Sequence, residues 1–235
     1  MKARIKFRKY GALRFIGHLD VMRFFQKVMR RADIPIAFTG GYSPHMIMSF
    51  ANPLGIGLSS DGEYFDIELT EPVDSTEAVR RMNEACVEGI EVINFRQIAE
   101  EKKMTGMTIL AGADYLTKVR KGEFPDGWQE KFREFMSRKE IRIWKKTKRS
   151  EKEVDIRPLI YKWELRGESV YLQTAAGSSE NLKPDLVMEA FCAFLDISAE
   201  DISFMHHRLE MYADIGTEER NLVPLDALGT DMVCS

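Results

Sequence analysis

The most constraining feature of this chain is the order in which its hydrophobic period changes between that of a strand and that of a helix. Residues 3–8 ("ARIKFR") alternate apolar and basic side chains, which predicts a strand with one solvent-exposed face. The further predicted elements are a helix at 19–32, strands at 34–39, 45–51 and 63–70, a helix that begins at Asp74 or Ser75, and a strand at 90–98. We interpret this order as the split β-α-β-β-α-β unit of a ferredoxin-like domain.

The second half of the chain repeats this order of elements without repeating the residues. Its predicted elements are a strand at 108–120, a helix at 127–139, a strand at 141–148, a hairpin of 155–167 with 169–175, a helix at 182–195 and a strand at 202–212. We therefore predict an α+β chain of two tandem ferredoxin-like domains, at 1–100 and 105–213, joined by a polar linker. Residues 214–235 show no clear pattern and are interpreted as a tail.

Apolar runs and cysteine spacing bear on where the chain works and on what it binds. There is no run of about 18 apolar residues, so we expect neither a transmembrane helix nor a membrane partner. The N-terminal "MKARIKFRKYG" lacks the apolar region of a signal peptide, which favours a cytoplasmic location. Cys86, Cys192 and Cys234 are far apart and form no CxxC pair, so the sequence predicts no metal site and no cofactor.

Positive charge is concentrated in two segments, although the net charge of the chain is −3. Residues 1–31 carry ten Lys and Arg against one acid, a balance of +9, and residues 138–152 carry eight against two acids, a balance of +6. This asymmetry favours a basic surface that attracts nucleic-acid phosphates; two solvated faces without a ligand are the alternative. If RNA binds, phosphate contacts are expected from Arg14, Arg23, Lys27, Lys146, Arg149 and Arg157.

The loop "GGYSPH" at 40–45 is predicted to display Tyr42 and His45 at the end of a strand. Tyr42 is the best candidate for stacking on an unpaired base. His45, and His18 in "GHLD", are candidates either for positioning a base or for general acid–base catalysis. The sequence contains no GxSxG motif, Walker loop, HExxH or paired carboxylates. These absences favour a protein without catalytic activity of its own.

Two further cations, Arg157 and Lys183, have sequence neighbours that suggest a partner or a ligand. Arg157 lies between Ile156 and Pro158 in an apolar run, so its guanidinium requires either an ion-pair partner, such as Asp155, or a phosphate. Lys183 precedes a predicted helix, where its ammonium and the first backbone N–H groups could hold an anion; an ordinary helix N-cap is the alternative.

Several motifs are shared with a known family. They are "LRFIGHLD", "GGYSPH", "PLGIGLSSDGEY", "EVDIRPLI" and "NLKPDLVMEA", spread over residues 1–210. Together they resemble the radical-SAM-linked protein family, a bacterial domain of unknown function. The resemblance implies a partner, because such domains are fused to, or encoded beside, a cobalamin-binding radical S-adenosylmethionine (SAM) protein. This chain has no CxxxCxxC motif for an iron–sulfur cluster, so it would serve as the partner of the radical enzyme.

The sequence therefore supports one leading hypothesis and two alternatives. The leading hypothesis is a non-catalytic RNA-binding or substrate-presenting accessory protein that works with a radical SAM partner in RNA modification or processing. The first alternative is an RNA-processing enzyme that uses His18 or His45 as its general acid or base. The second is a module that binds only the radical SAM protein.

Overall fold

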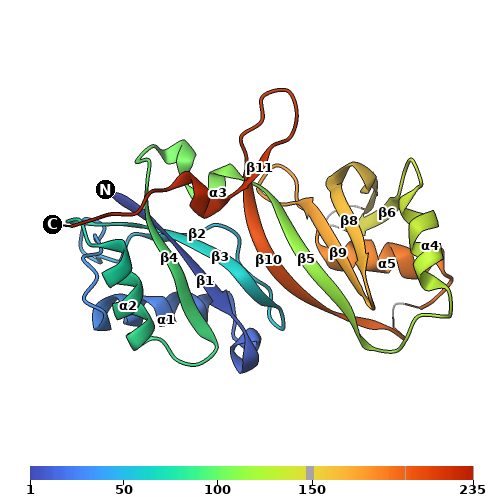
Figure 1. The fold of residues 1–235 in the computed structure, drawn as a ribbon, viewed down its shortest axis with the longest axis horizontal. Helices are drawn as coiled ribbons and strands as arrows, with labels where there is room; N and C mark the ends of the chain where they lie inside the picture. The colour runs from blue at the N-terminus through green and yellow to red at the C-terminus, as the bar shows by residue number, and fades with distance from the viewer. Residues whose placement is uncertain (147–150, 199, 235) are drawn as a thin grey trace. The chain divides into compact units, whose positions relative to one another are not determined.

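The computed structural model describes residues 1–146, 151–198 and 200–234, which form a mixed α+β fold with a mostly antiparallel sheet (Figure 1). The chain divides into two compact units, one of residues 1–112 and 208–235 and one of residues 113–207. These units differ from the expected ranges because the chain changes unit inside two long strands, β5 (Leu110–Lys121) and β10 (Ser203–Asp214). No helix of the described residues is long and apolar enough to cross a membrane.

The first unit contains a sheet in the order β4-β1-β3-β2 in which each neighbouring pair is antiparallel. The strands are β1 (Lys2–Lys9), β2 (Met48–Phe50), β3 (Ser59–Glu68) and β4 (Ile90–Ile98). Helix α1 (His18–Arg31) follows β1, and α2 (Ser75–Ala85) follows β3. The order along the chain is thus β-α-β-β-α-β, as expected for residues 3–98.

The two long helices of the first unit cover one face of this sheet. The apolar stripe of α1, which includes Val21, Phe25 and Met29, packs in one core with Phe7 of β1 and Phe65 of β3. The ring centroids of Phe25 and Phe65 are 4.6 Å apart. Helix α2 begins as predicted, because the Asp74 carboxylate accepts a 3.0 Å hydrogen bond from the backbone N–H of Glu77.

Two predictions for the first unit are wrong. Residues 34–39 form no strand and make only two isolated bridges, from Ile36 to Leu69 and from Phe38 to Met46. Residues 214–235 are more than a tail, because they include β11 (Leu222–Pro224), which pairs with β10, and a 3-10 turn, η4 (Leu225–Leu228). Met232 is buried in the core beside α2, and its backbone N–H donates to the hydroxyl of Ser75.

The second unit contains strands in the order β10-β5-β9-β8, where β8 (Ile160–Arg166) and β9 (Ser169–Ala175) form an antiparallel hairpin. Helices α4 (Trp128–Met136) and α5 (Pro184–Phe194) pack on this sheet. Their contact is aromatic: the Phe132 and Phe191 rings lie 4.8 Å apart, nearly perpendicular.

A separate two-stranded sheet lies within the sequence of the second unit. It pairs β6 (Arg142–Lys146) with β7 (Glu151–Asp155). The strand expected at 141–148 corresponds to β6, whereas β7 was not predicted as a separate strand. Its register places Arg142 opposite Asp155 and Trp144 opposite Glu153. The sequence "EKEVD" has charged side chains on both faces, so it carries no clear period-two signal.

Candidate functional site

The basic side chains of β1 do not form the solvent-exposed face that the alternation predicted. Four cations alternate along β1 and point to the same face of the sheet, and each of them has a partner: Lys2, Arg4, Lys6 and Arg8. Arg4 is only 1% exposed and binds both carboxylate oxygens of Asp66, at 2.8 and 3.0 Å. Lys6 pairs with Glu210 and lies 3.6 Å from Asp226. These acids come from β3, β10 and η4 and neutralise the charges of Arg4 and Lys6.

The exposed face of α1 is different, because it retains its positive charge. Arg23, Lys27, Arg30 and Arg31 are all exposed and follow one another at helical spacings. Among the described residues the acid recorded beside them is Asp20, whose carboxylate lies 3.7 Å from the Arg23 guanidinium. We call these four residues the α1 column; it spans about 12 Å at 1.5 Å of rise per residue.

Arg14 precedes the column in a 3-10 turn, η1 (Gly11–Phe15). Its guanidinium lies over the exposed ring of Phe15, 4.7 Å from the ring centroid. The backbone carbonyl of Arg14 accepts a hydrogen bond from Gly57, which fixes η1 to the loop after β2. The guanidinium therefore lies beside an aromatic ring, three residues before the N-cap of α1 in sequence.

His18 is the first residue of α1 and lines a small buried cavity. Its ring is half-buried and meets the ring of Phe50 edge-on at 4.9 Å. Burial lowers the pKa of His18 below its usual 6.5, so the neutral imidazole is favoured at neutral pH. The cavity also borders Lys9 and Glu63, and its volume of about 10 Å³ leaves room for roughly one water molecule.

Three charged side chains at or beside this cavity are almost completely buried: Lys9 (1% exposed) and Glu63 (3%) line it, and Arg208 (4%) binds Glu63. The Arg208 guanidinium donates to both oxygens of Glu63, at 2.9 and 3.2 Å. The Lys9 ammonium donates to the carbonyl of Ile16 at 2.9 Å. Burial lowers the pKa of Lys9, and burial raises the pKa of Glu63 against the opposing effect of Arg208. Perturbed groups that share a cavity are typical of functional sites.

The sequence contained a signal for this cluster that our reading missed. The core-facing positions of β1 are every second residue, namely Ala3, Ile5 and Phe7. Lys9 is the next residue in this alternation and therefore also faces the core. A register shift between Phe7 and Lys9 marks a bulge in the pairing with β3, next to Glu63. A lysine at a core-facing position requires a buried partner. The Lys9 ammonium binds the backbone carbonyl of Ile16, and the carboxylate beside it is Glu63, which could not be identified because it lies 54 positions away in sequence on another strand.

The loop around Tyr42 has the displayed geometry that the glycines predicted. Tyr42 is fully exposed, and Gly41 adopts a positive φ of 100° that other residues rarely tolerate. His45 is exposed, and its Nδ1 lies 3.1 Å from the hydroxyl of Thr39 across the loop. The backbone of Thr39 and His45 also pairs, so the loop is closed by hydrogen bonds at its base.

His18 and His45 do not belong to one catalytic pair. His18 contacts Phe50, whereas His45 precedes Phe50 by five residues in the same extended segment, on the other side of Met46 and its bridge to Phe38. At about 3.3 Å per residue, the backbone of His45 is on the order of 16 Å from that of Phe50, the residue that His18 contacts, and no contact between the two histidines is recorded among the described residues. If either histidine acts as a catalyst, it acts without the other.

Arg157 is a candidate cation of the second unit that the structure describes in full. Arg157 lies in a 3-10 turn, η3 (Arg157–Leu159), and its guanidinium donates to the carbonyl of Ile160 at 3.3 Å. The Asp155 carboxylate binds backbone N–H groups, those of Ile141 and Arg157, instead of the guanidinium. Arg149 lies outside the described residues, and Lys146 is described only as the last residue of β6.

Lys183 is the N-cap residue of α5, and it makes no side-chain cap hydrogen bond. The first turn of α5 already contains an acid, Asp185, whose carboxylate lies 2.9 Å from Nε2 of the buried His206. Nδ1 of His206 lies 2.9 Å from the hydroxyl of Thr117 on β5. The sequence analysis missed this Thr117–His206–Asp185 chain. Thr117 is buried, so the chain fixes α5 to the sheet and offers no accessible nucleophile.

Comparison with known proteins places the chain in a family. A family model described as "Uncharacterized protein conserved in bacteria (DUF2344)" matches residues 2–184. The chain belongs to the DUF2344 family. The match includes β1, α1, the Tyr42 loop and the His18 cavity, and it includes most of the second unit. It carries no information about a radical SAM protein, so that connection depends on the sequence motifs alone.

A solved structure with some similarity to this DUF2344 chain is a "Crystal Structure of a Cbf5-Nop10-Gar1 Complex". The two chains are 13% identical with a TM-score of 0.46, over 89% of this chain and 48% of the other. This chain thus spans about half the length of that neighbour, and a likeness this weak carries no argument about function. No curated protein matches the DUF2344 chain.

Proposed function

We propose that this DUF2344 protein binds RNA through the α1 column and presents it to a separate enzyme of RNA modification or processing. The observation that carries the proposal is the contrast within residues 1–31: the cations of β1 are paired, whereas those of the α1 column are exposed. Phosphates of an RNA strand are the ligand that an exposed row of Arg and Lys attracts most strongly. An RNA substrate also fits the cytoplasmic location expected from the sequence.

The Tyr42 loop supplies the second contact of the proposed interface. Helix α1 ends at Arg31, five residues before Ile36, which bridges Leu69 beyond the end of β3. The loop that carries Tyr42 extends from the same region, since Phe38 bridges Met46. Tyr42 would stack on an unpaired base while Arg30 and Arg31 hold neighbouring phosphates. Arg14 and His18 would serve the other end of α1, and His45 would help to position the base at Tyr42.

The other cations that the sequence predicts as phosphate or anion contacts remain part of the proposal. Lys146, Arg149 and Arg157 are proposed phosphate contacts of the second unit. Lys183 is a proposed anion contact, although Asp185 competes with an anion in the same helical turn.

The test is the salt dependence of RNA binding by the full chain. If three cations of the α1 column each neutralise one phosphate, the logarithm of the association constant should fall with the logarithm of salt at a slope of about −2 for a single strand. The variant Lys27→Glu/Arg30→Glu should weaken binding and flatten this slope. The matched control is Lys131→Glu/Arg133→Glu on α4, where two exposed cations are paired with Glu134 and Glu130. Equal effects of both variants would refute a specific role for the α1 column.

We further propose that the enzyme served by this protein is a radical SAM protein. The support is the set of motifs quoted from the sequence and the absence of a cluster-binding CxxxCxxC motif in this chain. The protein should then capture a radical SAM protein from its native host, and the captured complex should contain RNA. Capture of RNA without such an enzyme would leave the RNA proposal intact and remove this one.

A histidine-dependent RNA-processing enzyme is the second candidate, and the His18 cavity favours it over a site at His45. The lowered pKa of His18 keeps the imidazole neutral, as a general base requires. The protein alone should then cleave or modify RNA, and His18→Gln should abolish turnover while leaving binding nearly unchanged. Loss of fold stability without a separate loss of turnover would remove this candidate.

A module that binds only its protein partner is the third candidate. It is supported by the exposed apolar side chains of Phe15, Leu19 and Ile56, which lie around the start of α1. Capture of the partner would then survive nuclease treatment and retain no RNA. It would also be lost in Leu19→Glu but not in Lys27→Glu/Arg30→Glu.

We also propose that both units are ferredoxin-like and arose by duplication. The support is the strand order. If the β6–β7 hairpin is treated as an insertion, the first to fourth strands of the second unit are β5, β8, β9 and β10. Their order in the sheet, β10-β5-β9-β8, then matches the order β4-β1-β3-β2 of the first unit. A deletion variant that lacks only β6 and β7 should then keep the fold of the second unit. Circular dichroism and amide exchange of this variant, compared with the full chain, measure that.

A further inference from the structure

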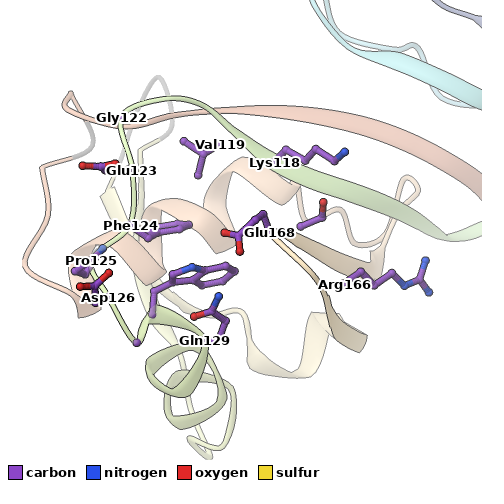
Figure 2. A pocket seen from close by; sticks show the side chains of 13 residues that line it. Lys118, Val119, Gly122, Glu123, Phe124, Pro125, Asp126, Gln129, Arg166 and Glu168 are labelled. Carbon is purple, nitrogen blue, oxygen red and sulfur yellow. The ribbon is translucent and has the colours of Figure 1, made fainter.

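The second unit contains a cavity of about 620 Å³ that the proposed RNA interface does not use. It lies between the end of β5, the loop 122–127, the start of α4 and the turn that joins β8 to β9 (Figure 2). This volume is within the range of small-molecule sites in proteins. The loop is held open by Gly122 and Gly127, which have positive φ values of 79° and 76°.

One wall of the cavity is aromatic. Phe124 of the loop and Trp128 of α4 both line it, with their ring centroids 5.0 Å apart. Phe124 is backed by Phe191 and Phe204, at 5.3 and 5.9 Å, so its ring cannot move away from the wall. A planar ligand can therefore stack on a surface that is already fixed in position.

The polar groups of the lining include donors and acceptors for which the described part of the chain records no hydrogen bond. Ser169 is 5% exposed and Trp128 is 6% exposed, and no hydrogen bond of either side chain is recorded within the described residues. Figure 2 shows the amide of Gln129 and the carboxylate of Glu168 around the central space, with Lys118 on one side of it. Neither polar atom is among the buried unsatisfied atoms of the described residues, so both open onto the cavity, where solvent or a ligand can bind them.

The charges of the lining are predominantly negative. The carboxylates of Glu123, Asp126 and Glu168 have no recorded ion-pair partner in the described part of the chain, and Lys118 is the corresponding cation. Arg166 also lines the cavity, but its guanidinium binds Glu164 at 2.8 Å and covers the ring of Tyr171 at 4.1 Å. The site therefore does not favour a phosphate, although it suits a ligand with several hydroxyl or amino donors.

We propose that this cavity binds the nucleoside part of a nucleotide, that is, a base with its ribose. The base stacks on Phe124 and exchanges hydrogen bonds with Gln129, Ser169 and the indole N–H of Trp128. The ribose hydroxyls donate to the carboxylates, as ribose does in dinucleotide-binding sites. A simple organic cation would leave the Ser169 hydroxyl and the Trp128 indole N–H unused, and a phosphate would meet the three carboxylates.

The proposal does not depend on RNA binding by the α1 column, because free nucleosides carry no phosphate and are tested without RNA. The four ribonucleosides, their 5′-monophosphates and spermidine are titrated into the full chain, followed by calorimetry and by the indole N–H resonance of Trp128 in NMR. That resonance is assigned with Trp128→Phe. At least one nucleoside should bind with a Kd of about 1 mM or tighter. Its monophosphate should bind no more tightly than the nucleoside.

Two variants and two matched controls locate the site. Ser169→Ala and Glu168→Gln should each weaken the nucleoside about tenfold, the effect of one hydrogen bond to a buried or charged group. Glu130→Gln on α4 and Lys121→Ala on β5 lie outside the lining and should have no effect. Because Ser169 and Glu168 lie at the β8–β9 turn, thermal unfolding of each variant separates lost binding from lost fold.

Several results would overturn the proposal: no binding of any nucleoside, equal effects of the variants and the controls, binding of spermidine alone, or tighter binding of the monophosphates. Competition by an unstructured hexanucleotide would identify an RNA strand as the source of the bound nucleoside. Absence of competition, with nucleoside binding intact, would identify a free nucleoside. Either of these last two results supports the site, whether or not the α1 column binds RNA.

Discussion

β1 and α1 contribute five and four cations to the same basic segment, and the fold places them in different environments. On β1, Arg4 and Lys6 lie against Asp66, Glu210 and Asp226 and are largely withdrawn from water. On α1, the cations of the α1 column are exposed. The comparison teaches that a local excess of charge is not a surface property. Only the part of the excess that the fold leaves unpaired attracts a ligand.

The largest effect on stability is expected for the variant Arg4→Met. The variant leaves the Asp66 carboxylate buried beside the backbone N–H of Gly106 but without its guanidinium partner. Removal of one partner of a buried pair costs about 3–5 kcal/mol of unfolding free energy. Denaturant unfolding should show this loss, whereas the matched variant Arg23→Met on the α1 column should remain within about 0.5 kcal/mol of the wild type.

The double variant Arg4→Met/Asp66→Leu checks the physical reason. Replacement of both charges by apolar side chains removes the uncompensated carboxylate, so most of the lost stability should return. If Arg4→Met costs no more than Arg23→Met, the pair is not buried and the contrast between β1 and α1 fails.

A smaller effect is expected at Lys6, which separates pairing from RNA binding. Lys6→Met leaves Glu210 with hydrogen bonds from the hydroxyl of Tyr64 and the backbone of Met211, so the carboxylate keeps part of its stabilisation. We expect a loss of about 1–3 kcal/mol in unfolding free energy and no change in RNA affinity. A fall in RNA affinity without a loss of stability would mean that RNA reaches the face of β1.

The reasons for the wrong predictions are visible in these residues. The periodicity of β1 correctly predicts a strand and two distinct faces. It cannot show that the basic face is covered, because Glu210 and Asp226 are more than 200 positions away in sequence. A separation of 157 positions likewise hides the packing of Met232 against Ser75 of α2. Long-range partners decide whether a polar face is wet, and a local pattern contains no information about them.

Local signals, in contrast, predicted local structure well. The helix periodicity and the Asp74 cap give α1 and α2 within a few residues, and the strand at 90–98 is found at those positions. The glycines of "GGYSPH" predict the displayed loop. The cavity lined by Phe124 and Trp128 could not be predicted, because its lining combines two stretches, 118–129 and 166–169, that are far apart in sequence.

At Lys27 the expected effect on stability is negligible, and the effect on RNA binding is measurable. Lys27→Ala removes an exposed ammonium with no recorded partner among the described residues. The free energy of unfolding should therefore change by less than about 0.5 kcal/mol. The slope of RNA affinity against salt should become less steep by about 0.7, the contribution of one phosphate on a single strand. The control, Lys131→Ala on α4, should leave the slope unchanged; a matching change there would make the binding a general effect of net charge.

The smallest expected effect is the pH dependence contributed by His18. Because burial lowers the pKa of His18 in the folded state, the unfolded chain binds more protons between that pKa and 6.5. The stability of the protein should therefore rise as the pH increases through this window, and His18→Gln should remove that part of the slope. His45→Gln, at an exposed histidine, is the matched control and should leave the slope unchanged. Denaturant unfolding at a series of pH values measures both.

RNA should shift this titration in the opposite direction if His18 contacts a phosphate. A nearby phosphate favours the charged imidazolium and raises its pKa, so RNA affinity would increase as the pH falls while the stability of the free protein decreases. His18→Gln would abolish both trends. If the affinity trend is absent and the stability trend is present, His18 belongs to the interior of the first unit, and the proposed interface is confined to the α1 column and the Tyr42 loop.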